Sequence, residues 1–165
     1  MGDRHQLRAL PALKPMPSLK PIHPLRTLQD LCESNYRKLR RLIPGLRQLE
    51  SGAVALQNGQ PALHVRLLEK APFTLTLELS YCFDHGPQPL FEPALRLRVY
   101  LDAGMVEVLE DAERPPLRIR GPVDRQVLEH KWQMNYFLDK WLDHCLQRGY
   151  RFSADDRPKA ATANL

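Results

Sequence analysis

A lysine and two asparagines fall on the apolar faces of two helical stretches, where together they could bind an anionic ligand. In EHKWQMNYFLDKWLDHCLQRGY, Lys131 and Asn135 lie near about +20° and +60° within an apolar arc from about −100° to +80°. In TLQDLCESNYRKLRRLIP, Asn35 lies near about −40° within a similar arc. Buried polar groups without partners cost about 1–3 kcal/mol each, so these side chains must be satisfied. We therefore predict that the three converge, with Glu33 or the backbone at a strand end as the counter-group for Lys131.

Three interpretations of this cluster stay open at the level of the sequence. The favoured one is a structural polar cluster between two helices and a sheet, or a Lys131 that extends to solvent along its aliphatic stem. The second is a site for a small anionic or polar ligand in a mostly apolar cleft. In the third, Lys131 has a lowered pKa and acts as a catalytic amine. The catalytic residues of an enzyme remain unknown from the sequence.

A second group of residues could form an interaction surface. Arg37, Arg40 and Arg41 cluster on the outer side of the first helical stretch, and Trp132 and Tyr136 lie outside the apolar arc of the second. Exposed aromatic residues one turn apart can form a protein contact patch.

RNA binding would need several stacking aromatic residues beside the arginines of one sheet face. Tyr100 is the only obvious one, because Phe73 and Tyr81 fall on the apolar side of their strand. Arg96 and Arg98 on that face are typical of a solvated sheet surface. Nucleic acid is therefore a disfavoured partner.

Other chemistries lack their sequence signals. There is no glycine-rich phosphate-binding motif, so no dinucleotide or nucleotide cofactor is predicted. Cys82 and His85 form a lone C-x-x-H without a second pair, and no metal site is predicted. Cys32 and Cys145 fall on apolar stripes, which favours core cysteines over nucleophiles.

The elements that must position these residues follow from hydrophobic periodicity. A helix is predicted over 27–43, ended by Pro44-Gly45, and a long helix follows Gly121-Pro122 and stops at Gly149. Alternating strands are predicted between them, with hairpin turns at Asn58-Gly59 and at 102–104, a loop over 83–94 and a short strand at 116–120. The expected fold is α+β: an N-terminal helix, an antiparallel β-meander of about five or six strands, and a long C-terminal helix packed on one sheet face.

Composition and charge define the outline of the chain. Its 165 residues suit one domain, with 43% hydrophobic and 26% charged residues. Much of the net charge of +5 comes from the proline-rich first 26 residues, so the remaining body is close to neutral. We predict a disordered basic arm over 1–25, a single α+β domain over 26–150 and a disordered tail over 151–165.

The predicted compartment is the cytoplasm. The proline-rich N-terminus has no uninterrupted apolar segment of the kind that a secretory signal requires, and no stretch has the length of a membrane span. Three cysteines without framework spacing suit a reducing environment. No membrane association is predicted.

Several sequence blocks resemble one bacterial family. LCESNY and LRRLIP, then RVYLDAGMVEV, then KWQMNYFLDKWLDHCLQRG are similar to the YqiB-like proteins of proteobacteria, a family of unknown function. The resemblance spans Leu31 to Gly149 and implies a small cytoplasmic protein. It carries no mechanism, because none of its shared positions has an assigned role. These positions are Cys32, Glu33, Asn35, Arg40, Arg41, Pro44, Asp102, Lys131, Gln133, Asn135, Trp141, Cys145 and Gly149.

The sequence thus favours a non-enzymatic domain that binds a small anionic ligand or another protein. An enzyme acting on a small anionic or nucleotide-derived substrate is the first alternative, and an RNA-associated factor is the second.

Overall fold

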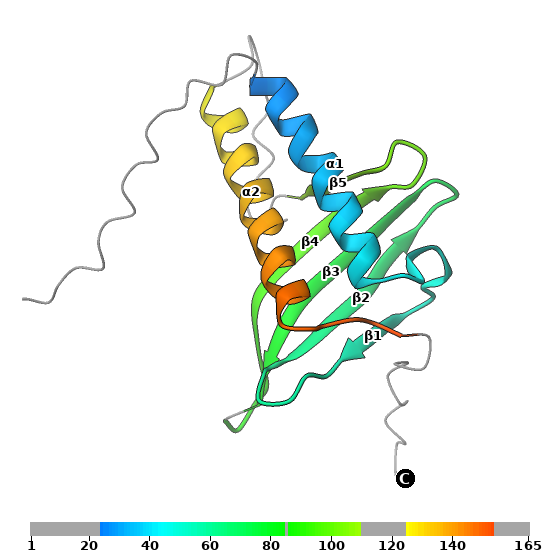
Figure 1. Cartoon of the computed structure of the whole chain (residues 1–165), viewed down its shortest axis with the longest axis vertical. Helices are drawn as coiled ribbons and strands as arrows, with labels where there is room; N and C mark the ends of the chain where they lie inside the picture. Colours follow the sequence, from blue (N-terminus) through cyan, green and yellow to red (C-terminus); the bar gives the residue numbers. More distant parts are fainter. Residues whose placement is uncertain (1–23, 85, 110–124, 154–165) are drawn as a thin grey trace, which may run out of the picture.

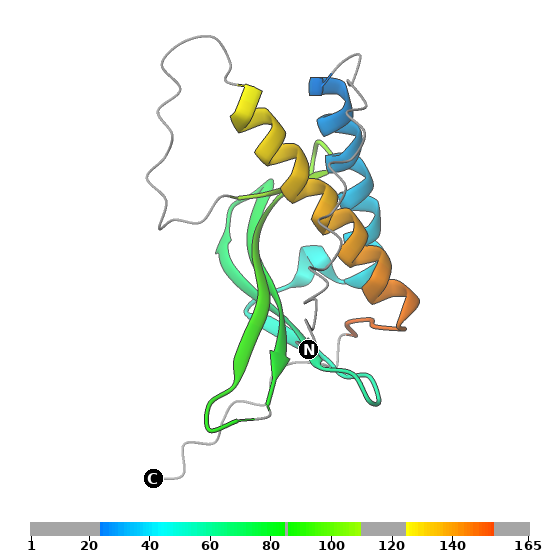
Figure 2. The ribbon, with the colours of Figure 1, turned by 90° about the vertical axis from the view of Figure 1, so that its left-hand side faces the viewer.

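Two helices pack on one face of a five-stranded antiparallel sheet, as predicted (Figure 1). The computed structural model describes residues 24–84, 86–109 and 125–153, and the predicted strand at 116–120 lies outside them. Seen from the side, the helices form one layer and the curved sheet the other (Figure 2). The elements in chain order are α1 (Pro24–Leu42), the short helix η1 (Leu46–Gln48), β1 (Gly52–Ala55), β2 (Ala62–Lys70), β3 (Thr74–Phe83), β4 (Leu90–Tyr100), β5 (Met105–Val108) and α2 (Arg125–Gln147).

The sheet is a meander in which each strand pairs with the next, in the order β1-β2-β3-β4-β5. Alternation along β3 sends Leu75, Leu77 and Leu79 into the core, where all three are fully buried. Leu77 pairs with Leu97 of β4, and that register stacks the apolar rows of neighbouring strands under the helices.

The predicted turns hold at one hairpin and differ at another. Gly104 has φ +64° in the β4–β5 turn, where its N–H donates to the Tyr100 carbonyl at 2.9 Å, as expected of a glycine hairpin. Asn58 and Gly59 do lie at the centre of a turn, closed by Gln60 N–H to Gln57 O at 3.1 Å. The β1–β2 strands have already separated by then, because their last pair is Ala55 with Leu63, so this is a longer loop and the tight hairpin prediction is wrong.

The loop predicted over 83–94 is also too long. Strand β4 begins at Leu90, and Phe83 pairs with Leu90 while Cys82 pairs with Phe91. Prolines on both sides suggested a loop, yet an irregularity in the register between Ser80 and Cys82 lets the strand accommodate them. The β3–β4 hairpin therefore extends farther than the sequence indicates.

The two helices run parallel, side by side over the inner face of the sheet (Figures 1 and 2). Leu39 and Leu42 of α1 and Leu138 and Leu142 of α2 are fully buried between the layers. Helix α2 ends at Gln147, two residues before the predicted stop at Gly149, whose φ is +84°. The packing continues past residue 150, because Phe152 is buried and its N–H donates to the Leu42 carbonyl at 2.9 Å.

Candidate functional site

Asn35 and Asn135 meet between the helices, as their positions on the apolar arcs suggest. Both are buried, and Asn35 Nδ2 donates to the backbone carbonyl of Asn135 at 3.2 Å. The Asn135 side chain accepts the Val108 N–H at 3.0 Å and donates to the Lys131 carbonyl at 2.8 Å. We call these four residues the asparagine network.

The network ties α2 to the edge of the sheet. Val108 belongs to β5, an edge strand of the sheet. Its N–H points away from β4, because the next residue, Leu109, donates its N–H to the Arg96 carbonyl of β4. Such an unpaired edge group invites pairing with another chain or costs free energy when buried. Asn135 satisfies it, which gives a structural reason for an amide on the apolar face of α2.

Lys131 joins this network through its backbone carbonyl, and its side-chain ammonium takes no part in it. It is half-buried, and within the part of the chain that the structure describes it forms no ion pair. Glu33, the counter-group named from the sequence, instead accepts a hydrogen bond from Gln29 at 3.0 Å, one helical turn away. The structure thus brings the two asparagines together but does not join the lysine to the glutamate.

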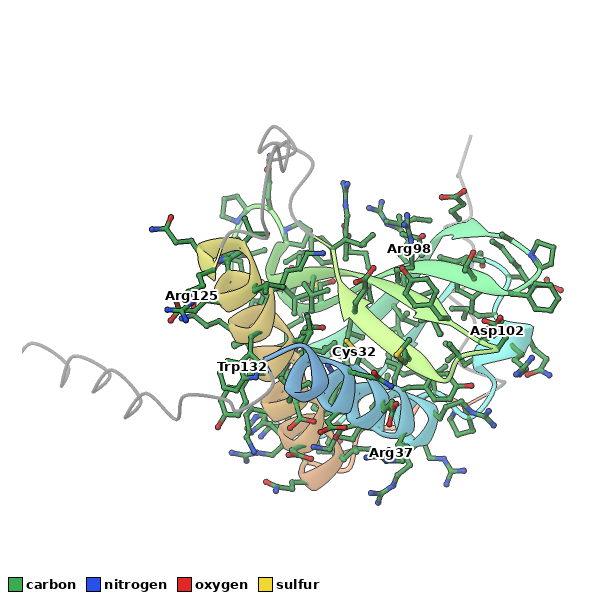
Figure 3. All side chains as sticks on the ribbon, turned by 90° about the horizontal axis from the view of Figure 1, so that it is seen from above. Cys32, Arg37, Arg98, Asp102, Arg125 and Trp132 are labelled. Atoms are coloured by element: carbon green, nitrogen blue, oxygen red, sulfur yellow. The ribbon has the colours of Figure 1, made fainter. Side chains whose placement is uncertain are left out.

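Cys32 lies beside the network, between α1 and the sheet (Figure 3). Its Sγ is 3.9 Å from Asn135 Oδ1. Burial raises the pKa of this thiol to about 11, and Glu107 adds to the effect while Lys131 opposes it. Burial likewise raises the pKa of Cys145 to about 11. Both thiols therefore stay protonated near neutral pH, which suits core cysteines better than nucleophiles.

A charged cluster that the sequence analysis missed lies farther along the same helix pair. The Lys38 ammonium bonds Asp139 and Asp143 at 2.8 Å each, and Ser34 Oγ donates to Asp139 at 2.8 Å. Burial opposes ionisation of Asp139, but the bonds from Lys38 and Ser34 outweigh it and hold the pKa of that carboxyl below its ordinary value. Residues 34 and 38 and residues 139 and 143 share a four-residue spacing, a signal that two parallel helices can pair them.

The predicted interaction residues form two separate groups. Arg37, Arg40 and Arg41 are exposed on α1, with Arg37 pointing away from the sheet (Figure 3). Trp132 and Tyr136 stack on α2 with ring centroids 5.0 Å apart. Among the described residues, no hydrogen bond, ion pair or ring contact joins the arginines to this stack.

An apolar patch that was not predicted lies where α2 faces the β3–β4 hairpin. Phe137 is 45% exposed, and Leu90, expected in a loop, is 52% exposed. Ring contacts connect Phe137 to Trp141 at 6.2 Å, Trp141 to Tyr81 at 5.3 Å and Tyr81 to Phe83 at 6.2 Å between centroids. Because Phe83 pairs with Leu90, the five side chains are contiguous, and we call them the α2–β3 patch.

The outer sheet face is electrically balanced over its central strands. Arg66 pairs with Glu78 at 3.1 Å, and Glu78 also stands opposite Arg96 in the register. The Tyr100 hydroxyl donates to Glu107 at 2.7 Å, which engages the one aromatic residue expected to stack on RNA. Arg98, on the same face, lies on the opposite side of the molecule from Arg37 (Figure 3). Such a face is typical of a solvated sheet surface.

The described residues hold neither a metal-binding cluster nor a membrane-spanning helix. In that part of the chain, histidine, cysteine, aspartate and glutamate side chains form no group of three or more that could hold a metal ion. His85, the second residue of the lone C-x-x-H, lies outside it. No described helix has the length and apolar character needed to cross a membrane.

Comparison with known proteins gives a family without an assigned activity. The family model described as "Protein of unknown function (DUF1249)" matches residues 38–151. The chain is 27% identical over 124 residues to "Uncharacterized protein YqiB" of Escherichia coli K12, covering 72% of this chain and 86% of the relative. The proteins of the same name from E. coli O6:H1 and O157:H7 match to the same extent. No solved structure matches the chain significantly.

Proposed function

The chain belongs to the DUF1249 family of proteins of unknown function, and we propose that it is a non-enzymatic protein-interaction domain whose docking surface is the α2–β3 patch. The observation that carries the proposal is the continuity of the patch. Ring contacts through buried Trp141 and Tyr81 link Phe137 to Phe83, and Phe83 pairs with Leu90 across the β3–β4 hairpin. Single exposed apolar residues need no explanation, but a contiguous aromatic group on a rigid base is typical of a contact surface.

The base of the patch supports this role. Trp141 and Tyr81 are buried, and the Tyr81 hydroxyl lies 3.4 Å from Cys145 Sγ. Their rings are therefore fixed by the core, so little side-chain entropy would be lost when a partner binds to them. Phe137 and Leu90 stand on a helix and a strand, which hold their positions better than loops do.

The ligand-binding alternative loses support at Asn135, one of the residues that suggested it. Every polar atom of the Asn135 side chain already has a protein partner, which leaves little capacity for an anion. Core thiols with a raised pKa are poor nucleophiles, so Cys32 and Cys145 do not favour catalysis. The proposed compartment is the cytoplasm, supported by the three unpaired cysteines.

The test is photo-cross-linking in the native cells. A photo-reactive phenylalanine analogue replaces Phe137. The matched control carries it at Phe73, which is 64% exposed and directly precedes β3, at the strand end opposite Phe83. We expect a discrete adduct with another polypeptide from position 137 and none from position 73. Equal labelling at both positions, or no adduct from 137, would refute the proposed docking surface.

A further inference from the structure

Between Leu7 and Ile22 the chain carries a large apolar side chain at every third position. This period does not match the helical repeat of 3.6 or the strand repeat of two. The positions are Leu7, Leu10, Leu13, Met16, Leu19 and Ile22. The two sets of residues between them differ in kind: one set holds the basic residues Arg8, Lys14, Lys20 and His23 together with two prolines, and the other holds small residues and prolines.

A polyproline II helix is the regular conformation that gathers these residues on one face. It has three residues per turn, and proline is its preferred residue. An α-helix is blocked by the prolines inside the segment, and a β-strand would send consecutive members of the apolar set to opposite faces. In a polyproline II helix the same residues form one apolar face, one basic face and one face of small residues and prolines.

Chain length and the starting point of α1 let this segment reach the α2–β3 patch. The segment ends where α1 begins, at Pro24. Cys32 of α1 lies beside Asn135 of α2, so Phe137 stands about 15 Å farther along the helix pair than Pro24, at a rise of about 1.5 Å per residue. Residues 7–22 as a polyproline II helix span about 47 Å, enough to reach Phe137 and to continue toward Leu90.

We propose that residues 7–22 bind the α2–β3 patch of their own domain as a polyproline II helix, with the apolar face on Phe137, Phe83 and Leu90. Proline-rich segments bind aromatic surfaces with a small loss of entropy, because the helix is already extended before binding. The inference rests on the proposed function and names the chemistry of the ligand: an extended segment with an apolar residue at every third position. A partner of the same kind must displace the arm.

The test uses the purified full chain with the photo-reactive residue at position 137. We expect an intramolecular adduct of monomer mass whose fragments map to residues 7–22. One alanine inserted after Pro15 rotates Met16, Leu19 and Ile22 off the apolar face, and it should lower the yield severalfold. Three inserted alanines restore the phase and should preserve the yield within about twofold.

A second pair of variants separates apolar contact from charge. Leu13→Ser with Met16→Ser should lower the intramolecular adduct as strongly as the single insertion, while Lys14→Ser with Lys20→Ser should leave most of it. An adduct of dimer mass alone, no adduct with the arm, or equal yields from the one- and three-alanine insertions would overturn the inference.

The in-cell experiment distinguishes this failure from failure of the proposed function. With one alanine inserted, the adduct between position 137 and the partner polypeptide should increase, because the arm no longer competes. If that adduct is present but insensitive to the insertion, the arm does not cover the patch although the patch still binds a partner. If neither adduct forms, the patch is not a docking surface.

Discussion

Replacing Asn135 by leucine should destabilise the fold far more than the same change at Asn35. Leucine has the branched outline of asparagine but no polar atoms. At position 135 it removes the acceptor of the Val108 N–H, and Val108 is only 6% exposed, so water does not replace the bond. A buried donor without a partner costs about 1–3 kcal/mol, and the apolar contacts of leucine offset part of this. We expect Asn135→Leu to lower the free energy of unfolding by about 2 kcal/mol.

Asn35 makes a weaker case for its amide. Its Nδ2 has one bond, to the Asn135 carbonyl, and its Oδ1 is buried without a hydrogen-bond partner among the described residues. Leucine removes that unsatisfied oxygen, so Asn35→Leu should change the free energy of unfolding by less than about 1 kcal/mol. Urea unfolding at 25 °C with linear extrapolation measures both values, with the m-value checked for constancy. Equal destabilisation by the two variants would show that Val108 does not depend on Asn135.

The pairing and burial of individual side chains lead to three further predictions. Asp139→Asn should be less stable than the wild type at pH 7. The difference in stability should shrink as the pH falls below about 4, because a carboxyl with a lowered pKa stabilises the fold only while it is ionised. Urea unfolding at a series of pH values measures this difference. A thiol reagent added to the native protein should modify half-exposed Cys82 first, and buried Cys32 and Cys145 only on unfolding. Equal modification rates for all three thiols would contradict this burial. Lys131→Met keeps the aliphatic stem, so thermal unfolding should change little, and a large loss would reveal a buried ion pair.

The fold could be predicted from the sequence because its signals are periodic. Alternating leucines in β3 and the turn at Gly104 define strands and a hairpin without reference to other parts of the chain. The start of β4 at Leu90 could not be predicted, because the pairing of Phe83 with Leu90 overrides local proline signals.

The candidate site was only partly predictable. Helical arcs identify Asn35 and Asn135 as inward-facing, but the partner of Asn135 is a backbone N–H at a sheet edge, which depends on how the strands are ordered. Phe137 lies at the border of its arc, where the direction of the neighbouring strand decides exposure. The α2–β3 patch arises from residues far apart in the chain, so no local pattern marks it.

The central claim is that the interaction surface is the α2–β3 patch and that the Lys131 side chain lies outside it. The most direct measurement places the photo-reactive residue at Leu90 and compares the partner adduct in cells across three backgrounds: Phe137→Ser, Lys131→Met and the control Phe73→Ser. Truncating a central aromatic contact costs more than about 1.4 kcal/mol, so Phe137→Ser should lower the adduct about tenfold while the other two preserve it. Loss of the adduct in Lys131→Met, with full retention in Phe137→Ser, would contradict the claim.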